Sequence, residues 1–280
     1  MIGFIGLGVM GEPMCRNLAA KCRQPILGYD VNAAPLARLC IEAAKSVAEI
    51  GERCDTVFLS LPGVDEVRAV CAALPMRRGS CIVDLSTTTV ALARELHDGF
   101  KNRGIEFADA PVARTRAAAE SGTLAVMVGA TEAVFKRIRP LLAHMGSDIT
   151  HCGGPGAGQA TKLINNMVLF QNVVALAEAL TLARAAGLSP QRLFETLTTG
   201  SADSFALRNH GMKALVPGDF PERAYSVDYA LKDLGYVLDL AKEAALELSG
   251  AQNARAALEH AKSAGLGAQY FPVLVKTLGS

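Results

Sequence analysis

A glycine-rich turn near the N-terminus constrains the fold of this chain most strongly, because it joins an apolar run to a helical pattern. Residues 1–6 form a short apolar run that ends in glycine, and residues 14, 18 and 19 continue with helical spacing. The turn reads Gly6, Leu7, Gly8, Val9, Met10 and Gly11. In such strand–turn–helix units the glycines close the turn, let a pyrophosphate approach the backbone and let the helix pack on the strand. The helix N-terminus then faces the phosphates with free N–H groups, so we predict that these six residues bind a dinucleotide.

A carboxylate follows the next apolar run, residues 26–30, at Asp30. It lies about 20 residues after the last motif glycine, where an acid can hydrogen-bond the ribose diol of the cofactor. Because a carboxylate there would repel a 2′-phosphate, NAD is favoured over NADP. The alternative role for Asp30 is that of a turn or helix-cap residue before Val31 and Asn32.

Strand-like and helical patterns alternate up to about residue 153. Apolar runs of strand length lie at residues 56–61, 81–85, 105–108, 124–128 and 148–152, and helical patterns lie between them at residues 64–73, 90–103 and 131–143. This alternation predicts an α/β fold with a doubly wound, largely parallel sheet. Ligands bind at the carboxyl ends of such strands.

Three loops at predicted strand ends carry candidate binding residues. Leu61, Pro62 and Gly63 end one strand, and Ser86, Thr87, Thr88 and Thr89 end the next. The threonines are suited to contact the cofactor, but a helix N-cap is an equally natural role for them. The third loop carries Ala113, Arg114 and Thr115. Its arginine either pairs with an anionic substrate group in a two-pronged geometry or is an ordinary surface side chain.

Residues 153–187 begin with glycines and continue for 28 residues without Pro or Gly, which favours one long helix. At 1.5 Å per residue it reaches ~40 Å, enough to cross from one domain to another. Near its start, Lys162, Asn165 and Asn166 share one side of the helix among apolar residues. A lysine with two amides in this setting is the best catalytic candidate in the chain, and a solvated surface lysine is the alternative. We expect helices from there to the end, with breaks near Gly200, residues 217–221, Gly250 and residues 265–267; Lys232 and Asp233 could form a plain solvated pair.

Composition narrows the possible functions. The net charge is +1 without a dense Lys/Arg run, so nucleic-acid binding has no electrostatic support. No apolar segment is expected to span a membrane, and no basic region precedes the first apolar run, so we expect no signal peptide. The seven cysteines form no CxxC pair, which suits reduced thiols in a cytoplasmic protein. The five histidines show no ligand spacing, so we predict no metal.

Five sequence blocks resemble the β-hydroxyacid dehydrogenase family, which includes 3-hydroxyisobutyrate dehydrogenases and is similar to 6-phosphogluconate dehydrogenase. They read GFIGLGVMGEPMCRNL, DLSTTT, DAPV with the later SGTLAVMVGA, GGPGAGQATKLINN and KDLG. The resemblance implies a Rossmann NAD-binding domain over residues 1–153 and an all-α substrate and oligomerisation domain over residues 154–280, joined by the long helix. It implies that Lys162 is catalytic, that Asn166 or Asn165 lies beside the substrate, and that Thr88 and Lys232 approach NAD. Members of the family form homodimers or homotetramers.

One block departs from the common family pattern. After DAPV the family has Ser-Gly-Gly, which holds the substrate carboxylate, whereas this chain has Ala113-Arg114-Thr115. In this it resembles 3-sulfolactaldehyde reductases, in which Gly-Arg-Thr grips a sulfonate, and enzymes that reduce succinic semialdehyde, although Ala113 replaces the glycine and Leu169 replaces a serine. We therefore predict NAD-dependent hydride transfer to a small anionic aldehyde, with Lys162 as general acid and base. The alternatives are a 3-hydroxyisobutyrate or tartronate semialdehyde (2-hydroxy-3-oxopropionate) enzyme, a non-catalytic NAD-binding protein and an imine reductase.

Overall fold

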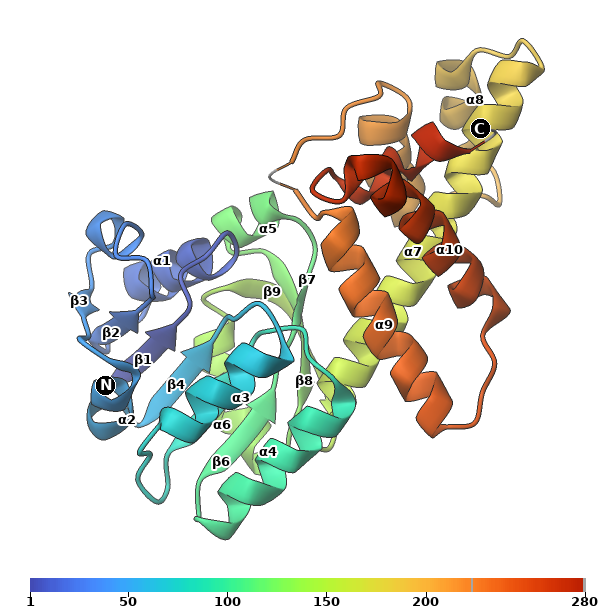
Figure 1. Ribbon diagram of the computed structural model, residues 1–280. Helices are drawn as coiled ribbons and strands as arrows, with labels where there is room; N and C mark the ends of the chain where they lie inside the picture. The colour runs from blue at the N-terminus through green and yellow to red at the C-terminus, as the bar shows by residue number, and fades with distance from the viewer. Residues whose placement is uncertain (223, 279–280) are drawn as a thin grey trace. The chain divides into compact units, whose positions relative to one another are not determined.

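The computed structural model describes residues 1–222 and 224–278. The chain divides into two compact units, Met1–Lys162 and Leu163–Ser280, and the division lies inside one long helix, α7 (Ala157–Ala185). The first unit is built around a sheet, and the second is helical (Figure 1). The boundary that we predicted from the sequence, between residues 153 and 154, lies ahead of α7, where the last strand ends.

The sheet of the first unit has the strand order β3-β2-β1-β4-β5-β6-β8-β7, with β9 paired to β8. All pairs from β3 to β6 are parallel. This is the strand order of the dinucleotide-binding doubly wound fold, so the predicted Rossmann sheet is confirmed. The six strands of this part are β1 (Ile2–Ile5), β2 (Ile26–Tyr29), β3 (Glu42–Ala43), β4 (Thr56–Leu59), β5 (Cys81–Asp84) and β6 (Glu106–Asp109).

The far edge of the sheet is mixed. Strand β8 (Leu124–Gly129) runs antiparallel to β6 and to β7 (Val112–Ala113), and it is parallel to β9 (Gly146–Gly153). The sequence did not predict β3 and β7, because two residues are too few to show any periodicity.

Helices cover both faces of this sheet (Figure 1). Side chains alternate between the faces along each strand. On one face Phe4 and Phe58 pack with residues of α1 and α6, and on the other Val57 and Ile82 pack with residues of α2, α3 and α4. Because both faces are buried, these strands read as continuous apolar runs. The helices of this unit are α1 (Gly11–Lys21), α2 (Val47–Arg53), α3 (Val64–Ala73), α4 (Val90–Asn102), α5 (Arg116–Ser121) and α6 (Glu132–Leu142), with a short 3₁₀ turn, η1 (Leu36–Arg38).

The second unit contains most of α7 and the helices that follow it, as predicted. They are α8 (Pro190–Leu197), η2 (Leu207–Leu215), α9 (Val227–Glu243), α10 (Ser249–Ala261), η3 (Lys262–Leu266) and η4 (Phe271–Thr277). The core includes Phe170 of α7, whose ring meets that of Phe271 edge to face with 5.4 Å between the centroids. A single bridge between Ser226 and Tyr270 is the one strand-like pairing in the described part of this unit.

The helix break that we expected near Gly250 is confirmed, because α9 ends at Glu243 and α10 begins at Ser249. Gly250 is the second residue of α10, and the chain turns before it, where Ala245 has a φ of 53°. A Cβ at Gly250 would lie 2.2 Å from the side-chain oxygen of Gln171 on α7. The glycine itself thus lies just inside the next helix, where it allows two helices to approach closely.

Helix α7 is long and apolar enough to span a membrane by length and composition alone. We had expected no segment of that kind. In its most apolar window, 44% of the residues are buried inside the protein. Core helices of globular proteins meet the same criterion, so this helix is weak evidence for contact with a membrane.

Candidate active site

The carboxyl ends of four neighbouring strands meet at one edge of the sheet. Ile5 lies opposite Leu59, Leu59 opposite Asp84, and Asp84 opposite Asp109, and each is the last residue of its strand. Ligands of doubly wound sheets bind at this edge, where the strand order reverses, which here is between β1 and β4. The predicted binding residues 6–11, 61–62, 87–88 and 113–115 all follow these strand ends.

The three motif glycines have three different surroundings. Gly6 has a φ of 92°, and a Cβ on it would lie 2.2 Å from the backbone oxygen of Ser60. A Cβ on Gly11 would lie 2.0 Å from the Gly6 oxygen, so α1 packs on the strand end only because the side chain is absent. A Cβ on Gly8 would meet nothing within 4 Å. A tight turn, an open backbone and a close helix contact are what a pyrophosphate site at this position needs.

Asp30 fixes the glycine-rich turn from the end of β2. Its carboxylate accepts a hydrogen bond from the Leu7 backbone N–H at 2.5 Å and another from the Asn32 N–H at 2.7 Å. The second bond is an Asx turn, so the turn-residue role that the sequence left open is realised. An ionised carboxylate has about four lone-pair positions, so two bonds leave it able to accept from a ribose diol as well.

The loop after β5 is held by hydrogen bonds on several sides. Ser86 Oγ accepts from the Leu61 N–H at 2.9 Å, and the Ser86 N–H donates to Asp84 Oδ1 at 3.0 Å. Thr89 Oγ1 accepts from the Leu92 N–H and caps α4. The capping role that the sequence left open for these threonines therefore belongs to Thr89. Burial raises the pKa of Asp84 to about 7, and the nearby charge of Asp109 adds to the rise.

Two buried residues for which we predicted no role, Asp109 and Gln159, hold the start of α7. Asp109 accepts from the backbone N–H groups of Gly156 at 2.7 Å and Gln159 at 2.8 Å, which places a carboxylate at the helix N-terminus. The Gln159 side chain accepts from the Thr88 N–H at 3.0 Å and donates to the Ser86 oxygen at 2.8 Å. Lys162 follows on the same helix and is half-buried. Asp109 lies in the DAPV block and Gln159 in the GGPGAGQATKLINN block, and this resemblance to the family was the one sequence signal that could have identified them.

Arg114 is held by three partners within its own unit. Its guanidinium donates to the Thr123 backbone oxygen at 2.6 Å and to Ser147 Oγ at 3.0 Å, and it pairs with Asp148 at 2.8 Å. Its φ of 85° lies in the left-handed region that glycine adopts without strain. The neighbouring Thr115 begins α5, but its hydroxyl does not cap the helix. The side chain that we predicted to grip a substrate anion is therefore held by three acceptors of the protein.

Asn166 belongs to a buried polar cluster of the second unit. Its Nδ2 donates to Asp233 Oδ2 at 2.8 Å and lies 3.3 Å from the Tyr225 hydroxyl. The Tyr225 hydroxyl donates to the same Asp233 oxygen. Burial, with the Asp233 charge as a further cause, raises the pKa of Tyr225 well above its ordinary value, so the phenol stays protonated and donates. Asn165 Nδ2 donates to Asn166 Oδ1 at 3.2 Å, which fixes the second end of the Asn166 amide.

Lys232 and Asp233 form a pair, but our hypothesis that both are solvated is wrong for Asp233. Asp233 is only 2% exposed. Lys232 Nζ lies 3.2 Å from Asp233 Oδ1, and it also lies over the rings of Tyr229 and Tyr236, at 5.3 and 5.5 Å from their centroids. Lys232 is thus held close to the Asn166 cluster.

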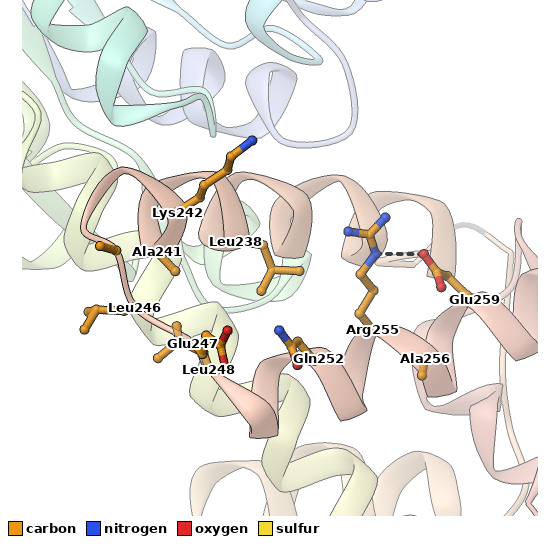
Figure 2. A pocket seen from close by; sticks show the side chains of 11 residues that line it. Leu238, Ala241, Lys242, Leu246, Glu247, Leu248, Gln252, Arg255, Ala256 and Glu259 are labelled. Atoms are coloured by element: carbon orange, nitrogen blue, oxygen red, sulfur yellow. Dashed lines mark hydrogen bonds and ion pairs between the residues drawn. The ribbon is translucent and has the colours of Figure 1, made fainter.

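A separate groove of about 540 Å³ lies between the end of α9 and the start of α10 (Figure 2). Leu238, Leu246 and Leu248 give it an apolar lining, and Arg255 and Glu259 form an ion pair at 2.7 Å. None of the predicted site residues lines this groove.

No group of three or more His, Cys, Asp or Glu side chains that could hold a metal ion occurs in residues 1–222 and 224–278. The absence of a metal stays a prediction.

Two family profiles cover nearly the whole chain. The profile described as the NAD binding domain of 6-phosphogluconate dehydrogenase matches residues 1–154. The profile described as NAD-binding of NADP-dependent 3-hydroxyisobutyrate dehydrogenase matches residues 156–278.

Characterised relatives and solved structures agree with these profiles. The chain is 35% identical over 98% of its length to 2-(hydroxymethyl)glutarate dehydrogenase of Eubacterium barkeri, of which the match covers 93%. It is 34% identical over 88% of its length to 2-hydroxy-3-oxopropionate reductase of Escherichia coli, of which 86% is covered. The structure of Mycobacterium tuberculosis 3-hydroxyisobutyrate dehydrogenase with L-serine superimposes with a TM-score of 0.90 at 32% identity, covering 100% of this chain and 99% of that one.

Proposed function

Because this chain belongs to the β-hydroxyacid dehydrogenase family, whose NAD-dependent members act on CH–OH groups, we propose that its substrate is a small β-hydroxy acid. In such a compound a single carbon separates the CH₂OH group from the carboxylate, and oxidation gives the corresponding semialdehyde. NAD is the cofactor. The compounds in the names of the three relatives share this spacing: 2-(hydroxymethyl)glutarate and 3-hydroxyisobutyrate as the alcohol, and 2-hydroxy-3-oxopropionate as the aldehyde.

The pairing of Arg114 carries the choice of substrate class. In 3-sulfolactaldehyde and succinic semialdehyde, two carbons separate the aldehyde from the acid group, and a free guanidinium would be the natural partner of that more distant anion. Here Asp148, Ser147 and the Thr123 oxygen already use the guanidinium. A substrate anion at Arg114 would have to share the guanidinium with the Asp148 carboxylate, whose negative charge opposes it. The observation therefore favours the one-carbon class.

The two-carbon class is our second candidate. Ala113-Arg114-Thr115 stands in place of the Ser-Gly-Gly that holds a carboxylate in the family pattern, and the Thr115 hydroxyl is not used as a helix cap. These two features support a site that takes a sulfonate or a longer acid.

The proposed chemistry needs one group that moves a proton at the substrate oxygen. NAD supplies the acceptor or the donor of the hydride when it is bound. Lys162 takes the hydroxyl proton in oxidation and returns it in reduction, when its ammonium also stabilises the developing alkoxide. Asn166, one helical turn further along α7, is buried and paired with Asp233 and Asn165, so of the two amides the exposed Asn165 is the one that orients the substrate, and Asn166 holds it in place.

A substrate panel tests this proposal. Oxidation of NADH would be followed with 2-methyl-3-oxopropionate, 2-hydroxy-3-oxopropionate, 3-sulfolactaldehyde and succinic semialdehyde. We expect kcat/KM to be at least about tenfold higher for the two 3-oxopropionates, which corresponds to about 1.4 kcal/mol. A preference for the other two aldehydes would establish the second candidate, and no turnover with any of the four would overturn both.

Two arginine variants sharpen this test. Arg114→Ala removes the side chain in question, and Arg116→Ala is the matched control, since Arg116 is exposed and pairs only locally, with Glu120 at 2.9 Å. Under the first proposal the two variants have similar KM values for 2-hydroxy-3-oxopropionate. Under the second, Arg114→Ala alone raises the KM for 3-sulfolactaldehyde.

A further inference from the structure

One buried amide joins the loop after β5 to the first turn of α7. Gln159 is 0% exposed, and both ends of its side chain are paired. Its Oε1 accepts from the Thr88 N–H at 3.0 Å, and its Nε2 donates to the Ser86 oxygen at 2.8 Å. A buried amide costs free energy unless it is hydrogen-bonded, and here the two backbone partners satisfy it.

The backbone of the same residue is held from the neighbouring strand. Asp109, the last residue of β6, accepts from the N–H groups of Gln159 and Gly156. A Cβ on Gly158 would lie 2.3 Å from the Met127 oxygen and 2.8 Å from the Asp109 oxygen, so the helix start is pressed against the sheet. The first turn of α7 thus has very little freedom to shift relative to the ends of β5 and β6.

The pattern of partners requires a neutral side chain that both accepts and donates. The Thr88 N–H needs an acceptor and the Ser86 carbonyl needs a donor, so the Gln159 amide has only one workable orientation. A carboxylate could accept but not donate. A methionine would fill the space and make neither bond.

From this geometry we propose that Gln159, braced by Asp109, is a positioning residue that sets the placement of Lys162 relative to the Thr88 loop. The inference rests on the proposed function, in which Lys162 moves the proton and Thr88 lies at the cofactor. Lys162 is three residues after Gln159 on the same helix, so a shift of this turn moves the amine directly. A misplacement of about 1 Å in such a site costs on the order of 100-fold in rate.

The test replaces Gln159 by glutamate, which keeps the shape and changes only the protonation chemistry. Burial raises the pKa of a glutamate at this position, to at most about 9, so at pH 9.5 the introduced carboxyl is ionised and cannot donate to Ser86. There we expect kcat to fall about 100-fold. The Kd for NADH should stay within about threefold, because the glycine-rich turn is untouched. At lower pH the carboxyl is protonated, and its O–H donates to Ser86 while its carbonyl accepts from Thr88. The kcat of the variant relative to wild type should therefore rise at least about tenfold between pH 9.5 and pH 5.5.

Other charged groups near this amide also titrate, and a new carboxylate would shift their pKa values, so a variant that adds no charge is needed beside Gln159→Glu. These charged groups are Asp84 from β5, Asp109 from β6, Arg94 of α4 beside Gly156, and Lys162 itself. Gln159→Met, which adds no charge, should lose kcat to a similar extent at all pH values. Thr161→Ala is the matched control, because it deletes a side-chain bond to the Ala157 oxygen in the same turn and leaves the Gln159 amide in place.

The outcomes separate this inference from the proposed function. Rescue of Gln159→Glu at low pH, with Gln159→Met impaired and Thr161→Ala close to wild type, supports the positioning role. A Gln159→Met rate that is close to wild type, or a Gln159→Glu ratio that does not change between pH 5.5 and pH 9.5, overturns it. If Lys162→Ala still turns over like wild type, the proposed function fails instead.

Discussion

Replacing Gly8 and Gly11 by alanine separates the cofactor role of the glycine-rich turn from its structural role. The two residues stand three positions apart in one motif, but an added methyl group meets opposite surroundings. At Gly8 it would meet nothing within 4 Å, whereas at Gly11 it would lie 2.0 Å from the Gly6 oxygen and 2.9 Å from the Gly6 carbonyl carbon.

The expected changes in stability follow from these distances. Gly8→Ala needs no adjustment of the folded protein and restricts the unfolded chain, so the free energy of unfolding should stay the same or rise by up to about 1 kcal/mol. For Gly11→Ala the backbone must move by about 1 Å, which typically costs about 1–3 kcal/mol. The better helix propensity of alanine recovers at most about 1 kcal/mol of this loss. In a chain of this size each kcal/mol shifts Tm by about 2–4 °C.

Cofactor binding should be affected by the alanine at position 8, the substitution that leaves stability unchanged. The methyl group of Gly8→Ala occupies the open face that we assign to the pyrophosphate, so NADH should bind at least about tenfold more weakly although Tm is unchanged. Thermal melts without cofactor and fluorescence titration with NADH measure the two effects separately. A Gly8→Ala protein that binds NADH as tightly as wild type would refute the assignment of this face.

Three further predictions concern titration and cofactor choice. Burial raises the folded-state pKa of Asp84 to about 7 from 3.8, so the folded protein binds this proton more tightly than the unfolded chain does, and wild type should lose stability as pH rises from about 4 through 7. The difference in Tm between pH 5 and pH 8 should be smaller for Asp84→Asn, and an equal difference in both proteins would contradict the raised pKa. Burial lowers the pKa of His210 to about 4 from 6.5, so the stability that the neutral imidazole contributes is present above about pH 6.5 and is lost as pH falls toward 4. Between pH 7 and pH 5 the free energy of unfolding in urea should fall more for wild type than for His210→Asn, and equal losses would count against the lowered pKa. Asp30→Ser should narrow the preference for NADH over NADPH, measured as the ratio of kcat/KM values, because the repulsion of a 2′-phosphate is gone; an unchanged ratio means that the carboxylate does not face the ribose.

Much of the first unit could be predicted from the sequence because its signals are local. Fully buried parallel strands read as apolar runs, and the glycine motif follows the first of them directly. Strands β3 and β7 have two residues each and carry no such signal. The break near Gly250 was predictable, but the close approach of Gly250 to Gln171 was not, because it depends on a residue far away in the sequence.

The cofactor-binding turn could be predicted because its glycines form a local sequence motif. The partners of Asp233 and Arg114 could not, because they come from distant parts of the chain. Asp233 read as a solvated partner of Lys232, but Asn166 and Tyr225 bury it. Nothing in the local sequence shows that Asp148 and Ser147 take the Arg114 guanidinium. The catalytic role of Lys162, the homodimer or homotetramer and the cytoplasmic location stay predictions.

The most direct test of the account is the turnover of Lys162→Ala at saturating aldehyde and NADH, with the Kd for NADH measured on the same preparation. General acid–base catalysis typically contributes about 100-fold to 10,000-fold. We predict a loss of kcat in this range, with the Kd for NADH within about threefold of wild type. A variant that binds NADH normally and keeps wild-type kcat would show that the proton is moved by another group.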